Sequence, residues 1–161
     1  EHGTYSLKER IATAKKVQKK GDINLKLEIE PIIFVPNYEK EYIKLIRKLL
    51  KELDVNKISK ITMGGVRIAA DYRGIIPQYF PDTDLLDMYM EKPDVSYDRY
   101  RYPIEERADL YLKLIAEIKN HCDCELGLGA ETPELWEAMN FDAAKAMSKN
   151  FFQYLDPNSD E

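Results

Sequence analysis

Segments with the 3.6-residue period of a helix alternate along this chain with segments that have the two-residue period of a strand. Residues 7–20 carry apolar side chains at helical spacing, and residues 23–30 then alternate apolar and polar side chains up to Pro31. The helices expected are 7–20, 39–53, 71–80, 103–120, 134–139 and 142–154. The strands expected are 23–30, 58–66 and 124–130, and residues 85–90 are expected to form a short strand or an extended segment. This alternation predicts an α/β fold of βα units around a mainly parallel sheet.

The number of expected strands bears on how much of a fold the chain contains. About four βα units are expected, and a closed (β/α) barrel needs roughly twice as many. We therefore expect half of a partial (β/α) barrel, in a single domain over residues 1–155 with a flexible tail over residues 156–161. The chain has 161 residues and begins with Glu1 rather than Met, which favours a piece of a longer protein.

Composition and charge narrow the functional classes. The formal net charge of −5 argues against a protein whose whole surface binds nucleic acid, but it leaves a local site open. No run approaches the ~18 apolar residues of a membrane-spanning helix, and no signal peptide is visible, so no membrane partner is expected. The two cysteines cannot form a disulfide framework, so we expect a reducing, cytoplasmic compartment.

Charged residues close three of the predicted strands: Glu30, Arg67 and Glu131. The carboxyl ends of parallel strands meet at one edge of a sheet, so we expect these side chains to share a pocket mouth. A guanidinium group beside two carboxylates is suited to a polar or anionic substrate. The alternative is that Glu30 and Glu131 cap helices or pair with surface lysines.

Glycines and cysteines give weaker signals. Gly64-Gly65 and the pair Gly127 and Gly129 allow close approach of the backbone, and packing near a strand end explains them better than a phosphate site does. Cys122 and Cys124 lie beside His121, which suggests zinc ligands. We predict no metal site there, because a strand would point the two sulfurs to opposite faces and no second ligand pair exists.

The segment Arg99-Tyr100-Arg101-Tyr102 interleaves aromatic rings with guanidinium groups. Such a pattern is suited to stacked bases and phosphates, so these residues are candidates for binding DNA or a nucleotide. A loop whose tyrosines cover the edge of the barrel, with solvated arginines, is an equal alternative.

Six segments in order resemble one known family. They are EHGTYSLKERIATAKKVQKKG, LEIEPII, ITMGGVRI, IIPQYFPDTDLL, RYRYPIEERADLY and AETPELWEAM. Each resembles a landmark of the spore photoproduct lyase group of radical S-adenosylmethionine enzymes, and together they extend from Glu1 to about Phe141. The resemblance implies the carboxyl-terminal half of such an enzyme, with a partial (β/α) barrel of the radical S-adenosylmethionine type.

The resemblance also implies cofactors and a partner. In this family, three cysteines spaced C-x-x-x-C-x-x-C hold a [4Fe–4S] cluster. The cluster generates a 5′-deoxyadenosyl radical from S-adenosylmethionine, and the radical opens a thymine-dimer photoproduct in DNA. This chain lacks the cluster motif. The resemblance therefore implies that the chain alone binds neither cofactor and is inactive, and that it works with an upstream cluster-bearing half of the same parent chain.

Family roles transfer only to matching positions. Arg101 and Tyr102 resemble the family's Arg-Tyr pair, which is implicated in substrate contact and radical transfer, so Tyr102 is the candidate catalytic residue. Glu30 stands where the family usually has Asp. Glu28 replaces a frequent His, and Pro103 follows Arg101-Tyr102 where the family continues toward a second Arg, so a relative with another substrate is an alternative.

A second function class remains open. The chain is alternatively a non-catalytic α/β module that binds a nucleotide or nucleic acid through Arg99, Arg101 and the tyrosines of the same segment. Such a half-barrel has an open sheet edge, and we would then expect it to form a homo-oligomer through that edge.

Overall fold

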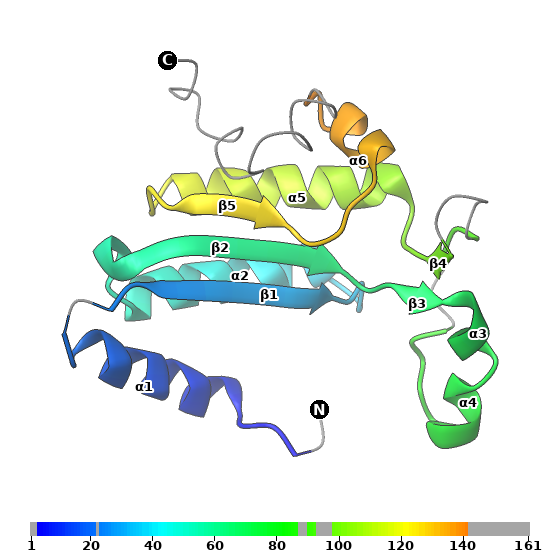
Figure 1. The fold of residues 1–161 in the computed structure, drawn as a ribbon, viewed down its shortest axis with the longest axis horizontal. Helices are drawn as coiled ribbons and strands as arrows, with labels where there is room; N and C mark the ends of the chain where they lie inside the picture. Colours follow the sequence, from blue (N-terminus) through cyan, green and yellow to red (C-terminus); the bar gives the residue numbers. More distant parts are fainter. Residues whose placement is uncertain (1–2, 22, 87–89, 93–97, 142–161) are drawn as a thin grey trace.

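The computed structural model describes residues 3–21, 23–86, 90–92 and 98–141. A parallel sheet lies at its centre, formed by β1 (Leu25–Ile32), β2 (Ile58–Gly65) and β5 (Glu125–Leu128) in the order β1-β2-β5 (Figure 1). The predicted α/β fold with a parallel sheet is confirmed. The sheet has three strands in the described part of the chain, where about four were expected, and its closure into part of a barrel stays a prediction.

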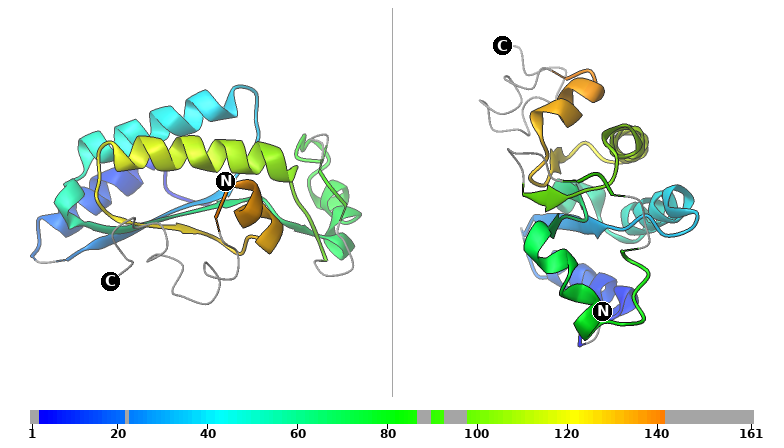
Figure 2. Two further views of the ribbon diagram at one scale, coloured as in Figure 1. Left: turned by 90° about the horizontal axis from the view of Figure 1, so that it is seen from above. Right: turned by 90° about the vertical axis from the view of Figure 1, so that its right-hand side faces the viewer.

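Helices cover one face of this sheet. Helices α2 (Tyr38–Glu52) and α5 (Ile104–Lys119) lie side by side on that face, and α1 (Leu7–Gln18) lies on the same side beyond the edge of β1 (Figure 2). The short helix α6 (Pro133–Ala138) packs against α5. The opposite face carries no helix among the described residues, and we call it the open face.

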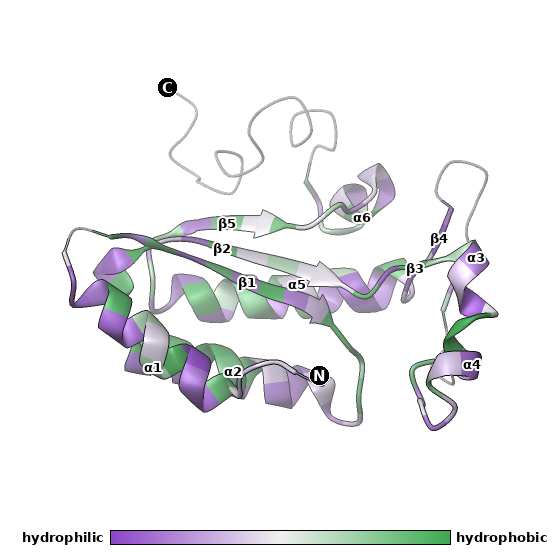
Figure 3. Ribbon diagram, turned by 60° about the horizontal axis from the view of Figure 1, so that its bottom comes forward, coloured by the Kyte–Doolittle hydropathy of each residue, from purple (hydrophilic) through white to green (hydrophobic). Residues whose placement is uncertain are grey.

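The core fills the space between the sheet and the helices. Strands and helices both contribute apolar side chains to it, at the strand and helix spacings predicted from the sequence. Figure 3 shows apolar and polar residues alternating along α1, α2 and β1. The buried core residues of the central elements are Ile29, Ile32, Ile46, Leu50, Ile61, Met63, Leu110, Leu114, Ile118, Leu126 and Leu128. The Ser6–Glu9 capping box expected before α1 is present.

Beyond the carboxyl end of β2, the chain forms a small arm with its own core. Strands β3 (Ile68–Ala69) and β4 (Arg99–Tyr100) pair antiparallel, and helices α3 (Ala70–Arg73) and α4 (Ile76–Tyr79) follow β3. The cluster that holds the arm together consists of Val66, Ile68, Met90 and Tyr102.

The arm differs from the sequence prediction in two ways. The helix expected over 71–80 is divided into α3 and α4 around Gly74. Residues 85–90, expected as a short strand or an extended segment, form no strand in their described part, where Leu85 and Leu86 lie in a turn. The strand that pairs with β3 is β4 instead. Its two residues are too few to show the apolar–polar alternation that predicts a strand.

Strand β1 extends further than its sequence pattern predicted. Pro31 lies inside β1, where a strand end was expected. A proline is tolerated there because β1 is an edge strand among the described strands, so the backbone on its outer side forms no ladder with them. The helix expected over 142–154 and the tail over 156–161 lie outside the described residues, and the single-domain boundary stays a prediction.

A short 3₁₀ turn, η1 (Val55–Lys57), joins α2 to β2.

Within the described ranges, no helix combines the length and the apolar character needed to cross a lipid bilayer.

Candidate functional site

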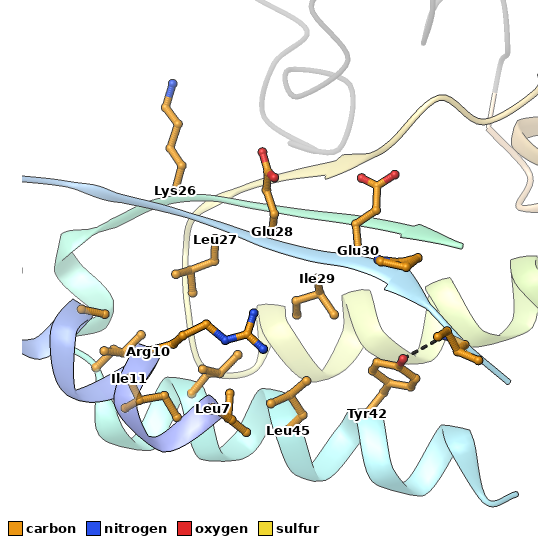
Figure 4. A pocket seen from close by; sticks show the side chains of 15 residues that line it. Leu7, Arg10, Ile11, Lys26, Leu27, Glu28, Ile29, Glu30, Tyr42 and Leu45 are labelled. Carbon is orange, nitrogen blue, oxygen red and sulfur yellow. Dashed lines mark hydrogen bonds between the residues drawn. The ribbon is translucent and has the colours of Figure 1, made fainter. Parts of the chain in front are cut away.

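Strand β1 separates an apolar side from a polar side. Figure 4 shows Leu27 and Ile29 pointing toward α1 and α2, whereas Lys26, Glu28 and Glu30 point away from the helices. The same alternation in β2 and β5 places polar residues and glycines on the open face, because their apolar neighbours are in the core. These open-face positions are Lys60, Thr62, Gly64, Glu125, Gly127 and Gly129.

Glu30 lies across the sheet at the carboxyl ends of the strands. A Cβ atom built on Gly64 would stand 2.7 Å from Glu30 Cδ, and one built on Gly129 would stand 2.6 Å from Glu30 Oε2. Real side chains do not approach so closely, so the carboxylate occupies space that only glycine leaves free at these two positions. This assigns the glycines a packing role beneath a candidate site residue.

Arg67 holds Glu30 in this position. Its guanidinium donates to Glu30 Oε1 and, at 3.0 Å, to the carbonyl oxygen of Gly129. The side chains of Arg67 and Glu30 are 27% and 25% exposed, so both remain in reach of a ligand on the open face. The pair presents a carboxylate and a guanidinium group side by side, which suits a ligand with polar or charged groups.

The third residue expected at this mouth, Glu131, is turned into the protein. Its side chain is only 1% exposed and forms ion pairs with Arg107 and, at 3.6 Å, with Arg101. The hydroxyl of Tyr111 also donates to it at 2.7 Å. The structure therefore brings Glu30 and Arg67 together, and places Glu131 in a separate buried cluster with Arg101.

Arg101 connects this cluster to the end of β5. One of its guanidinium nitrogens donates to the carbonyl oxygen of Ala130 at 3.0 Å. Burial lowers the pKa of Arg101, while the negative charge of Glu131 acts in the opposite direction. Ala130 itself has a positive φ of 45°, which is uncommon for a residue with a side chain.

Tyr102 lies in the core of the arm. It is 1% exposed, and its hydroxyl oxygen accepts a hydrogen bond from the backbone N–H of Phe34 at 3.2 Å. The ring stacks on Phe34 with centroids 4.0 Å apart, and Phe34 stacks in turn on Tyr38 at 4.1 Å. Burial raises the pKa of Tyr102, so the phenol stays protonated at neutral pH.

The other half of the aromatic and basic segment is more accessible. Arg99 is exposed and Tyr100 is half-buried in β4. The guanidinium of Arg73 lies 4.5 Å above the Tyr100 ring centroid, so one face of that ring is already covered. The four residues of the segment therefore divide between an accessible pair and the buried pair Arg101 and Tyr102.

Arg107 and Tyr111 are the residues that sequence reasoning missed. Both are buried on α5, one helical turn apart, on the same side as Leu114 and Ile118. The sequence feature that could have indicated them is Arg107, an arginine within the apolar stripe of an amphipathic helix. Such a residue is rarely buried unless it is paired with an acidic group.

The cysteines lie before β5 rather than inside it. Cys122 is buried with its sulfur 3.7 Å from the carbonyl oxygen of Val55. Burial and the neighbouring Cys122 thiol raise the pKa of Cys124 to about 12. The two thiols therefore interact. The expectation that a strand would point them to opposite faces is wrong, because residues two positions apart in a strand share one face, and both cysteines also precede β5.

The donor set does not suit an iron–sulfur cluster. Iron–sulfur clusters are held by cysteine thiolates, commonly four, and this chain contains two cysteines. Over the part of the chain that the structure describes, no group of three His, Cys, Asp or Glu side chains is arranged to hold a metal ion. His121 instead contacts Glu117 at 3.1 Å on the surface of α5 and the turn that follows.

Comparison with known families gives a match over most of the chain. The model of the family described as spore photoproduct lyase matches residues 1–124. No curated protein matches the chain significantly.

Solved structures of spore photoproduct lyase are also similar to this chain. The complex with dinucleoside spore photoproduct is 25% identical, with a TM-score of 0.64 over 79% of this chain and 38% of that one. A Tyr-to-Phe mutant is 23% identical, with a TM-score of 0.66 over 81% and 40% of the two chains. A double mutant with bound AdoMet and dinucleoside spore photoproduct is 22% identical, with a TM-score of 0.63 over 81% and 39%. The chain thus spans about two-fifths of the length of the structures it matches.

Proposed function

The chain belongs to the spore photoproduct lyase family, and from that premise we propose that it forms the substrate-side wall of the active-site pocket in a radical AdoMet enzyme of DNA repair. The substrate class is a thymine-dimer photoproduct, because a matched structure is described as a complex with dinucleoside spore photoproduct. The observation that carries the proposal is the open face, where Glu30 and Arg67 lie together above Gly64 and Gly129 at the carboxyl ends of the strands.

Residue roles follow from accessibility. Glu30 and Arg67 are the groups that reach substrate directly, since both side chains remain about a quarter exposed. Arg99 and Tyr100 contact the nucleic acid beside the lesion from the arm. Arg101 and Tyr102 lie deeper, and we assign Tyr102 a catalytic role that requires the arm to open or the substrate to reach its ring.

The cofactors belong to the rest of the enzyme. The chemistry that a [4Fe–4S] cluster and AdoMet supply when bound is the generation of a carbon-centred radical. Because Cys122 and Cys124 do not suit a cluster, we place it, together with AdoMet, in an upstream half of the same parent chain. This chain by itself is then inactive, and its residues bind and orient the substrate.

No strand among the described residues pairs with the outer edge of β1, and this open edge supports the idea of an upstream partner. A groove of about 350 Å³ lies beside this edge, and its apolar lining includes Leu7, Ile11, Leu27 and Leu45 (Figure 4). In a βαβ unit the helix packs beside the strand that precedes it. Helix α1 lies next to an edge of β1 that no described strand occupies. This arrangement is expected if the strand that precedes α1 belongs to another part of the parent protein. We propose that the upstream half supplies this strand.

Substrate binding tests the central proposal. Dinucleoside spore photoproduct is titrated into the protein by calorimetry, with Glu30→Gln and Arg67→Gln as variants. The matched control is Glu125→Gln, on the open face at the start of β5 and away from the carboxyl ends of the strands. We expect both site variants to bind at least about tenfold more weakly, which is the scale of one lost charge-assisted hydrogen bond. Equal affinity in all four proteins would contradict the assignment of the open face.

Two measurements separate the alternatives. A start codon directly before Glu1 in the source transcript would remove the catalytic proposal, whereas the cysteine motif C-x-x-x-C-x-x-C within ~150 upstream residues would support it. Salt-dependent affinity for single-stranded DNA without that motif would favour the binding module. Sedimentation then tests whether such a module pairs with a second copy through β1.

A further inference from the structure

A buried charged cluster lies behind the open face. At its centre is the carboxylate of Glu131. It forms ion pairs with Arg107 and Arg101 and accepts a hydrogen bond from the hydroxyl of Tyr111. Arg107 is 2% exposed and also donates from Nε to the carbonyl oxygen of Tyr102 at 2.7 Å. Each charged group faces an opposite charge inside the protein, as buried ions require.

Tyr111 is the member of this cluster that reaches β2. Its hydroxyl oxygen accepts the backbone N–H of Gly65 at 2.6 Å while the hydroxyl donates to Glu131. A Cβ on Gly65 would stand only 3.2 Å from that hydroxyl oxygen, so glycine keeps this contact free of crowding. One phenol thus joins the end of β2 to the segment that follows β5.

These two chain segments carry the candidate site. Arg67 follows Gly65 by two residues, and Glu131 follows Gly129 by two residues. Arg67 bonds the carbonyl oxygen of Gly129, so the two segments meet on the open face as well as inside the protein. The position of Arg67 relative to Glu30 therefore depends on how the ends of β2 and β5 are held.

We propose that Tyr111 is a positioning residue for the site: through its two hydrogen bonds it fixes the ends of β2 and β5, so that Arg67 and Glu30 face the substrate together. This inference rests on the proposed function for its substrate. Tyr111 is buried and acts through Gly65 and Glu131, without contacting the substrate itself. Burial and the charge of Glu131 also raise the pKa of Tyr111 well above its usual value, so the hydroxyl keeps its proton and remains a donor.

The test compares Tyr111→Phe with the matched control Tyr42→Phe. The Tyr42 hydroxyl also accepts a backbone N–H, that of Ile33 at 2.9 Å, but on the helix side of the sheet. Each substitution removes one hydroxyl and keeps the ring. The hydroxyl belongs to a buried residue in Tyr111 and to a half-buried residue in Tyr42. The measurements are the NMR signals of the Gly129 amide and the Arg67 guanidinium, and the affinity for dinucleoside spore photoproduct.

We expect Tyr111→Phe to shift both NMR signals and to weaken dinucleoside binding by about tenfold, whereas Tyr42→Phe changes neither. Unchanged signals and affinity in folded Tyr111→Phe would overturn the inference, as would equal effects of the two variants. If Tyr111→Phe does not fold, Gly65→Ala serves instead, because the added methyl would stand 3.2 Å from the same hydroxyl oxygen and force it to shift.

The same data separate this inference from the proposed function. If the unmodified protein binds no dinucleoside, the proposed substrate is wrong, and the NMR signals alone decide whether Tyr111 positions Arg67. If the protein binds the dinucleoside and Tyr111→Phe binds it equally well, the proposed substrate is supported and the positioning role of Tyr111 is wrong.

Discussion

The carboxylate of Glu30 lies so close to the backbone of Gly64 that a Cβ at that position would stand 2.7 Å from Glu30 Cδ. This contact brings the side chain of an edge strand over the central strand β2. There it meets the guanidinium of Arg67, which arrives from the end of β2. The shape of the candidate site therefore depends on the absence of a side chain at position 64.

Gly64→Ala is expected to displace the Glu30 carboxylate and to break its ion pair with Arg67. The free energy of unfolding should fall by about 1 kcal/mol, the low end of the cost of overpacking, because the end of a glutamate side chain can move aside. Urea denaturation of the single variants and of the double variant with Glu30→Ala measures the coupling. In the Glu30→Ala background the methyl group should cost almost nothing, and an equal cost in both backgrounds would contradict the contact.

Ala130→Gly is expected to stabilise the protein. Ala130 has a φ of 45°, and the left-handed region costs a residue with a Cβ about 1–2 kcal/mol, while glycine loses about 0.4–1 kcal/mol through greater freedom of the unfolded chain. The expected net gain is about 0.5–1 kcal/mol, measured by chemical denaturation. Ala116→Gly on the exposed side of α5 is the control and should destabilise by about 1 kcal/mol. A loss of stability in both variants would contradict the strain at position 130.

The main helices and the sheet were predictable because their signals are local. The apolar stripe of α5 and the alternation in β1 each repeat within one segment, and burial follows directly from the period. Strand β4 could not be found in this way. It has two residues, and its existence depends on pairing with β3, which lies some thirty residues earlier in the chain.

The candidate site was predictable only in part. The rule that strand ends share an edge correctly brought Glu30 and Arg67 together. The same rule also placed Glu131 there, but the left-handed turn at Ala130 directs Glu131 inward to Arg107 and Tyr111. Nothing in the local sequence around residue 131 encodes that turn, because it is sustained by contacts with a helix that precedes β5.

Tyr102→Phe is expected to lower turnover far more than it lowers the free energy of unfolding. The ring and its stacking on Phe34 remain, but the backbone N–H of Phe34 loses its acceptor, so the free energy of unfolding should fall by about 1 kcal/mol. In the parent enzyme, turnover should fall much further than this loss explains. Thermal denaturation and a turnover assay on the same preparations measure both effects.

The control for Tyr102 is Tyr38→Phe, at the other end of the same stack. The substitution keeps the ring, and Tyr38 lies on α2 with Phe34 between it and Tyr102, so turnover should be unchanged. An unchanged turnover in Tyr102→Phe would remove the catalytic role of this tyrosine and leave its hydroxyl as a structural group.

Stability should fall with rising pH because of Cys124. Burial, with the neighbouring Cys122 thiol, raises the pKa of Cys124 in the folded protein to about 12, from an ordinary value of 9.0. Between these two values the unfolded chain has lost the thiol proton and the folded protein has kept it, so each increase in pH favours unfolding. Cys124→Ala is expected to flatten this part of the pH dependence of stability, as measured by urea midpoints from pH 8 upward.

Cys122→Ala is the control for the pH dependence. It removes the neighbouring thiol but leaves the burial of Cys124, which is the larger cause of the raised pKa. Part of the decline in stability above pH 9 should therefore persist in Cys122→Ala and be missing only in Cys124→Ala. Tyrosines also ionise near the top of this range, so the comparison is made between variants at each pH. A decline of the same slope in Cys124→Ala as in the unmodified protein would show that this thiol is not the group responsible.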